Sequence, residues 1–269
     1  MDLRRASADS LAELSAELDD ALKAGSNPEK VAGELFTVAT ILRAEPPLRR
    51  VATDASLEQH AKQGLVKQVF EGKVDDVTMS LLVSAVARRW TGTRDLPDAL
   101  ERLSEITQVR SAGDRAEQLG DEIFALSQLI TANPDLRDAL SNPARSTEDK
   151  AALVDTLLGG KVLPATVALV KQALAGTYRT MTSALENYRQ VAASVQGEGV
   201  ATVRVVHSLS DSERERLSRA LSAQYGREIH LNEIVDPSVV GGMHVEIGDD
   251  VFDATVSSRL DDARRKLAG

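Results

Sequence analysis

The chain contains no cysteine, and aromatic residues make up only 3% of its 269 residues. The absence of cysteine excludes disulfide bonds, thiolate catalysis and cysteine ligation of a metal. The shortage of aromatic residues means that the hydrophobic cores must consist of leucine, valine and alanine, a composition that favours helices. The sequence also contains no apolar run of about 18 residues, so we expect no direct membrane insertion.

Positive charge is scarce, since the formal net charge is -9 at pH 7. Nucleic-acid binding draws its affinity from clustered lysine and arginine, so we expect no nucleic-acid partner. The same acidity argues against electrostatic attachment to an anionic membrane surface. Residues 1 to 10 lack the apolar core of a signal peptide. We therefore expect a soluble protein.

The first two thirds of the chain show helical periodicity. Leucines 11, 14, 18 and 22 recur at helical spacing, and Asn27 followed by Pro28 is a typical helix start. Further along, Ser146 with Asp149 three residues later forms a capping-box pattern. A length of 269 residues exceeds the usual size of one domain. We therefore expect at least two domains, mainly helical.

The helical part repeats itself at an offset of 88 residues without a gap. Examples are Glu34 with Glu122, Phe36 with Phe124, and Pro46 with Pro134. A unit of this length is about the size of a small domain and is too long for a solenoid repeat. The sequence predicts two tandem helical bundles, residues 1–94 and 95–197, followed by a small α+β domain, residues 198–269.

The α+β domain is predicted from a change of periodicity after the linker at residues 197–199. Residues 200–206 and 229–235 show strand character, with a capped helix between them that begins after Ser210. Met243, Val245 and Ile247 then alternate with His244 and Glu246, which is typical of a strand with one buried face. A short return strand and a terminal helix complete the expected domain.

The C-terminal domain also carries a constellation of residues that resembles a known family. These residues are Asp236, Pro237, Gly241, Gly242, Gly248, Asp249, Asp253, Arg259 and Leu260. In this order and spacing, they resemble the C-terminal signature of the delta subunit of F-type ATP synthases, the family of the oligomycin-sensitivity-conferring protein. Most members have one helical domain, so the first copy resembles a duplication of it.

The resemblance implies a non-catalytic peripheral-stalk subunit without a cofactor. Its helical part would bind the N-terminal helices of the alpha subunits in the catalytic head, and its C-terminal domain would bind the C-terminal end of the b subunit. The head would then be prevented from rotating with the central stalk. The implied location is the cytoplasmic side of the cell membrane, as a peripheral part of the complex.

A groove for the alpha subunit is expected between two helices of the second copy. The helix pair corresponds to the pair that binds the alpha subunit in the family, and helical spacing selects Leu100, Leu103, Leu169 and Ala173. The first helical copy has no counterpart in most members, so the resemblance implies no contacts for it.

Catalytic and ligand-binding alternatives find less support in the sequence. Gly159-Gly160-Lys161 is followed by Val162 and lies between helices, whereas a phosphate loop needs serine or threonine there and a strand before it. The four histidines lack metal-ligand spacing. The alternative that remains is a nucleotide-binding or enzymatic protein that uses the loops at Gly241, Gly242 and Gly248.

Overall fold

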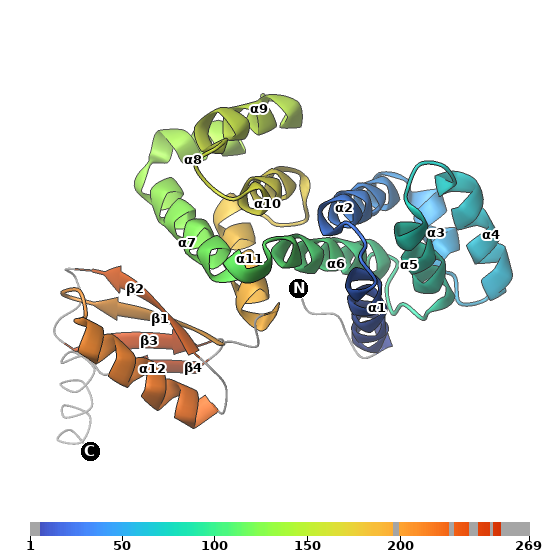
Figure 1. Cartoon of the computed structure of the whole chain (residues 1–269). Helices are drawn as coiled ribbons and strands as arrows, with labels where there is room; N and C mark the ends of the chain where they lie inside the picture. Colours follow the sequence, from blue (N-terminus) through green and yellow to red (C-terminus); the bar gives the residue numbers. More distant parts are fainter. Residues whose placement is uncertain (1–5, 196–198, 226–228, 237–241, 248–249, 254–269) are drawn as a thin grey trace, which may run out of the picture. The chain divides into compact units, whose positions relative to one another are not determined.

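The computed structural model describes residues 6–195, 199–225, 229–236, 242–247 and 250–253, and the chain divides into two compact units, Met1–Tyr188 and Arg189–Gly269 (Figure 1). The first unit consists of helices, whereas the second contains the strands. The predicted fold class, mainly helical with a small α+β part at the C-terminus, is confirmed.

The described helices of the first part follow one another with short connections. In chain order they are α1 (Ala6–Lys23), α2 (Pro28–Ala44), α3 (Pro46–Thr53), α4 (Gln59–Phe70), α5 (Asp76–Ala87), α6 (Asp95–Ser111), the 3-10 turn η1 (Gly113–Arg115), α7 (Ala116–Ala132), α8 (Pro134–Ser141), α9 (Thr147–Leu158), α10 (Pro164–Ala175) and α11 (Met181–Val195).

The helix bounds follow the sequence offset. Each of α7, α8, α9 and α10 begins and ends 88 residues after α2, α3, α4 and α5, respectively, as in 28 + 88 = 116 for the first residues of α2 and α7. The order and lengths of the helices thus recur. That the two sets superpose in space as copies of one bundle stays a prediction.

Local capping explains several helix starts. The Asn27 side chain accepts a hydrogen bond from Lys30 N at the start of α2, and Ser146 Oγ accepts one from Asp149 N at 3.0 Å at the start of α9. Asn133, before Pro134, makes no such cap. Its side-chain nitrogen instead donates to Leu129 O at the end of the preceding helix, because α7 and α8 follow each other without a loop.

Helix α6 contributes to the core of the first five helices. Leu96, Leu100 and Leu103 are fully buried in one cluster with residues of α1, α2, α4 and α5, such as Leu14 and Leu35. The boundary predicted after residue 94 therefore separates sequence repeats within one compact unit. The boundary does not divide the fold there because α6 packs into the core of the first five helices and is also the first helix of the second set. The division into three domains stays a prediction.

The second unit contains a four-stranded sheet with the order β2-β1-β3-β4. Its strands are β1 (Gly199–Val205), β2 (Ile229–Val235), β3 (Met243–Ile247) and β4 (Asp250–Asp253), and helix α12 (Asp211–Tyr225) connects β1 to β2. Strand β1 pairs with β2 in parallel and with β3 in the antiparallel direction. Strands β3 and β4 form the expected hairpin.

The alternation along β3 has the predicted effect. Val245 and Ile247 are buried with Val203 of β1, Ile229 of β2 and Leu221 of α12, whereas the side chain of Glu246 points to the other face. One face of the sheet therefore forms the core with α12. The predicted terminal helix lies outside the described residues.

Gly242 occupies the left-handed region, with φ of 81°, directly before β3. Glycine suits this position because a β-branched side chain at a positive φ would clash with its own backbone. We expect Gly242→Val to lower the free energy of unfolding of the second unit by ~1–3 kcal/mol. Chemical denaturation followed through the NMR signals of β1 and β3 measures this.

The matched control is Gly242→Asn, because asparagine tolerates the left-handed region better than valine. The asparagine variant should therefore lose less stability than the valine variant. Equal midpoints for the valine variant and the unchanged chain would contradict this explanation. Gly241 and Gly248, for which the same behaviour is expected, lie outside the described residues.

Candidate interaction surfaces

The four residues that the sequence selected for a groove are buried inside the first unit. Leu100, Leu103 and Leu169 have no exposed surface, and Ala173 is 8% exposed. Their helices α6 and α10 do contact each other. Helical spacing finds the apolar stripe that faces the core, and so it selects core residues rather than the residues beside them that line a surface groove. Binding of a partner by this helix pair stays a proposal.

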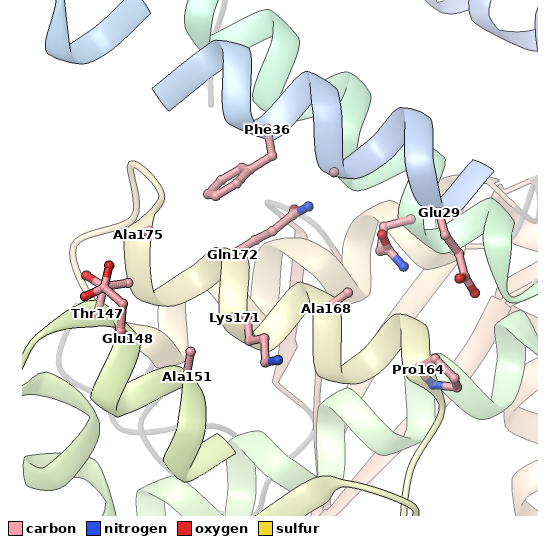
Figure 2. Close-up of a pocket in the computed structure, with 12 residues that line it drawn as sticks. Glu29, Phe36, Thr147, Glu148, Ala151, Pro164, Ala168, Lys171, Gln172 and Ala175 are labelled. Carbon is pink, nitrogen blue, oxygen red and sulfur yellow. The ribbon is translucent and has the colours of Figure 1, made fainter. Parts of the chain in front are cut away.

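An open groove of about 480 Å³ lies between α2 on one side and α9 and α10 on the other (Figure 2). Phe36 of α2 projects into it, opposite Ala168 and Ala175 of α10. Gln108 of α6 also contributes to its lining. The groove thus lies beside the predicted pair α6 and α10, and its lining residues come from both the first and the second set of helices.

Small side chains and acidic residues characterise this groove. Gly33 and Ala151 join the alanines of α10 in its lining, which permits close approach of another chain. Glu29 and Glu148 are exposed and lie on opposite sides. Lys171 is neutralised by Asp155, with a distance of 2.7 Å from Nζ to Oδ2. The groove therefore suits an apolar partner surface flanked by positive charge.

One buried amide beside the groove has a fixed orientation. Ser104 Oγ donates to Ala32 O at 2.7 Å, so it can only accept from Gln172 Nε2, which lies 2.8 Å away. This leaves Gln172 Oε1 without a partner among the described residues. The side chains of Ser104 and Gln172 thus join α2, α6 and α10.

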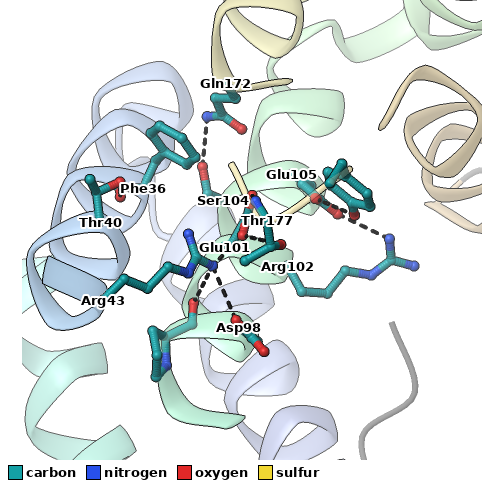
Figure 3. A network of polar contacts seen from close by, with 12 residues as sticks. Phe36, Thr40, Arg43, Asp98, Glu101, Arg102, Ser104, Glu105, Gln172 and Thr177 are labelled. Carbon is teal, nitrogen blue, oxygen red and sulfur yellow. Dashed lines mark hydrogen bonds and ion pairs between the residues drawn. The ribbon is translucent and has the colours of Figure 1, made fainter. Parts of the chain in front are cut away.

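A polar stripe on α6 continues this connection. Glu101, Ser104, Glu105 and Gln108 are buried and follow helical spacing, whereas another stripe of the same helix enters the first core (Figure 3). Sequence reasoning missed this stripe. Glu101 and Glu105 recur 88 residues after Glu13 and Glu17, but these counterparts are exposed, so the recurrence does not indicate burial.

Arg43 of α2 lies at one end of the stripe. Its Nη2 donates to Pro97 O at 3.2 Å and to Asp98 Oδ1 at 3.3 Å, and it also forms an ion pair with Glu101. Burial raises the pKa of Asp98, although the Arg43 charge opposes this effect. The guanidinium therefore compensates two carboxylates that have lost much of their hydration.

Glu105 lies one helical turn after Glu101 in the same stripe and is fully buried. It accepts hydrogen bonds from Tyr178 Oη at 2.7 Å and from Arg102 Nη1 at 3.1 Å. Burial raises the pKa of Glu105, and burial together with the nearby Glu105 charge raises the pKa of Tyr178. The tyrosine therefore keeps its proton and remains a donor at neutral pH.

The C-terminal signature is described only in part. Asp236 N donates to Val205 O at 2.8 Å, which continues the pairing of β2 with β1, and Asp253 of β4 pairs with His244 of β3. Gly242 precedes β3 with the conformation given above. The remaining signature residues lie outside the described residues: Pro237, Gly241, Gly248, Asp249, Arg259 and Leu260.

Features of catalytic and metal sites are weak in the described part of the chain. Gly160 follows α9 with φ of 71°, and Lys161 N donates to Leu158 O, which is a helix end rather than a phosphate loop. Among the described residues, no group of three or more histidine, cysteine, aspartate or glutamate residues could hold a metal ion. The helices within the described ranges are also too short or too polar to cross a membrane.

Comparisons with known proteins agree with these observations. The family described as "ATP synthase delta (OSCP) subunit" matches residues 103–267. The chain is 51% identical to "ATP synthase subunit delta" of Nocardioides sp. over 268 residues, which are 99% of this chain and 98% of the relative. It is 39% identical to the protein of the same description in Kineococcus radiotolerans, over 97% of this chain and 96% of the relative.

These relatives match along almost their whole length, so they include the first set of helices as well as the second. A chain in a structure of the Toxoplasma gondii mitochondrial ATP synthase hexamer matches 61% of this chain and 97% of its own length, with a TM-score of 0.36 and 16% identity. Because the family matches more than half of the chain and the Nocardioides relative matches nearly all of it, this protein belongs to the ATP synthase delta (OSCP) subunit family.

Proposed function

We propose that this chain is a peripheral-stalk subunit that links the alpha/beta head of the proton-translocating F-type ATP synthase to its b subunit. The linkage prevents the head from rotating with the central stalk, so that rotation performs work on the catalytic sites. The observation that supports this proposal most directly is the division into two compact units, each with a core of its own. Two such units in one chain provide two places of attachment.

In this proposal, the first unit binds the N-terminal helices of the alpha subunits. The groove between α2 and α10 has a volume of about 480 Å³ and a largely apolar lining, which suits a helix that presents apolar residues at i, i+3, i+4 and i+7. The exposed Glu29 and Glu148 favour a helix with basic residues beside its apolar stripe. The first set of helices contributes Phe36 to the same groove, which gives this set a role in binding the head.

The second unit binds the C-terminal end of the b subunit in this proposal. Val235 at the end of β2 is 49% exposed, so a large apolar side chain remains available at the edge of the sheet. The complex places the chain at the cytoplasmic side of the cell membrane as a peripheral component. The subunit itself is non-catalytic and needs no cofactor.

The alternative is nucleotide binding or catalysis at the loops of Gly241, Gly242 and Gly248, and the described residues give it little support. Of these glycines only Gly242 is described, and it precedes a strand rather than a helix, whose N-terminus would attract a phosphate. Calorimetry of the full chain with ATP, ADP and GTP separates the two functions. Micromolar nucleotide binding would favour the alternative.

The direct test is capture of the head by the tagged full chain from detergent-solubilised membranes. We expect the alpha and beta subunits to be retained by the unchanged chain. Ala168→Glu should reduce their retention about tenfold or more, because it places a charge in the apolar groove against a partner side chain. Immunoblots for alpha and beta measure retention.

Ala144→Glu is the matched control, since Ala144 is exposed and lies outside the groove. It introduces the same charge and should retain the head as the unchanged chain does. If neither the unchanged chain nor the control retained the head, the proposed function would be wrong. If all three forms retained it equally, the head would bind elsewhere on the first unit.

A further inference from the structure

The connection between α10 and α11 runs directly over two buried carboxylates of α6. Thr177 donates twice to Glu101, from its backbone N to Oε1 at 3.2 Å and from Oγ1 to Oε2 at 2.8 Å. A Cβ atom on Gly176 would lie 2.2 Å from Glu101 Oε1, so only glycine allows this approach. The chain is thus held against α6 as soon as α10 ends.

The second carboxylate reaches both the connection and α11 itself. Glu105 accepts from Tyr178 Oη at 2.7 Å and, through Oε2, from Asn187 Nδ2 of α11 at 3.1 Å. The Tyr178 ring packs edge-on against Tyr188, with ring centroids 5.7 Å apart at 83°. Tyr188 is fully buried. The first two turns of α11 are therefore attached to α6 by directional contacts.

The same positions 88 residues earlier form a weaker version of this arrangement. Glu13 and Glu17 of α1 are the counterparts of Glu101 and Glu105, and both pair with Arg88, the counterpart of Gly176 at the end of α5. Their side chains are 64% and 42% exposed, whereas Glu101 and Glu105 are fully buried. Exposed ion pairs contribute little to stability, so only the second pair can fix a helix firmly.

We infer that Glu101 and Glu105 form a clamp that fixes the start of α11 on α6 through Thr177, Tyr178 and Asn187. Buried polar contacts of this kind select one position of a helix, because any other position leaves a carboxylate unpaired. The boundary between the two compact units lies in α11, after Tyr188. A force that reaches α11 is therefore passed to α6, which is part of the first core.

The mechanical role of the clamp rests on the proposed function, but the clamp itself is tested without ATP synthase. Hydrogen exchange of the full chain is measured by mass spectrometry for residues 181–188 and for α2 and α5. We expect Thr177→Val to raise exchange of residues 181–188 about tenfold, because it removes a hydrogen bond to a buried charge at nearly constant volume. Exchange in α2 and α5 should stay unchanged.

Two further variants make the result decisive. Thr177→Ser retains the hydroxyl donor and should restore the exchange of residues 181–188 to its original rate. Glu17→Gln alters the exposed pair and should change exchange at the end of α5 by less than about twofold. Unchanged exchange of residues 181–188 in Thr177→Val would overturn the clamp, and so would an equal increase in α2 and α5, since that is a global loss of stability.

A failure of the clamp is distinguishable from a failure of the proposed function. The exchange experiment uses the chain alone, whereas capture of the head uses solubilised membranes. If the unchanged chain captures the head but Thr177→Val does not raise the exchange of residues 181–188, the proposed function stands and the clamp is wrong.

Discussion

Vesicles whose ATP synthase contains this chain without residues 199–269 will hydrolyse ATP but will not synthesise it from a proton gradient. The deletion removes the sheet and α12, which share a core of their own, and leaves the first core complete. On the proposed function, the head then keeps its contact with the first unit and loses its connection to the b subunit. Rotation of the central stalk would turn the head instead of driving its catalytic sites.

The measurements are ATP synthesis in vesicles with an imposed proton gradient and ATP hydrolysis by the detached head. Hydrolysis should be nearly unaffected, because the chain is non-catalytic in the proposal. The truncated chain should also still capture alpha and beta but no longer the b subunit. Coupled synthesis at the normal rate in vesicles that contain only the truncated chain would contradict both the role of the second unit and the stator mechanism.

Much of the fold followed from local patterns in the sequence. The strand Ile229–Val235 has the predicted bounds, and the alternation at Val245 and Ile247 correctly identified the buried face. The helix starts after Asn27 and Ser146 were also predicted correctly, because a helix cap depends on residues only three positions apart in the chain. Such features are fixed by neighbours in the chain, and so a single sequence contains them.

The interaction surfaces were harder to predict because they depend on which helices meet. Leu100 and Leu169 have the spacing of anchors in a groove, but that spacing is shared by every core-facing stripe. Phe36, which projects into the groove, comes from the other set of helices. Only the packing of α2 beside α10 brings it there. Sequence periodicity identifies which face of a helix is apolar, but it does not identify the helix that packs against this face.

The buried charges of α6 were missed for a related reason. A glutamate in a helix is usually exposed, so Glu101 and Glu105 resemble residues of a solvated face. Their burial results from α6 packing against α2 on one side and the α10–α11 connection on another. The sequence predicts that α6 begins a second set of helices, and the structure adds that it also completes the first core.

The second large effect is expected from Arg43→Met, which should lower the free energy of unfolding of the first unit by about 3–5 kcal/mol. Without the guanidinium, Glu101 keeps only its Thr177 donors, and its charge stays buried without compensation. Methionine preserves most of the aliphatic volume, so the loss reports the charge rather than a cavity. Chemical denaturation of the full chain, followed by Trp90 fluorescence, measures it in the core to which Trp90 belongs.

Arg88→Met is the matched control, because Arg88, like Arg43, pairs with two carboxylates, and its side chain is 17% exposed, close to the 21% of Arg43. Its partners Glu13 and Glu17 are largely hydrated, so we expect a loss of only about 0–1 kcal/mol. Adding Glu101→Gln to Arg43→Met should recover more than half of the loss, since the amide oxygen still accepts from Thr177 and carries no charge. Equal losses for the two arginine variants, or no recovery in the double variant, would show that burial of the Glu101 charge does not determine the stability of this helix contact.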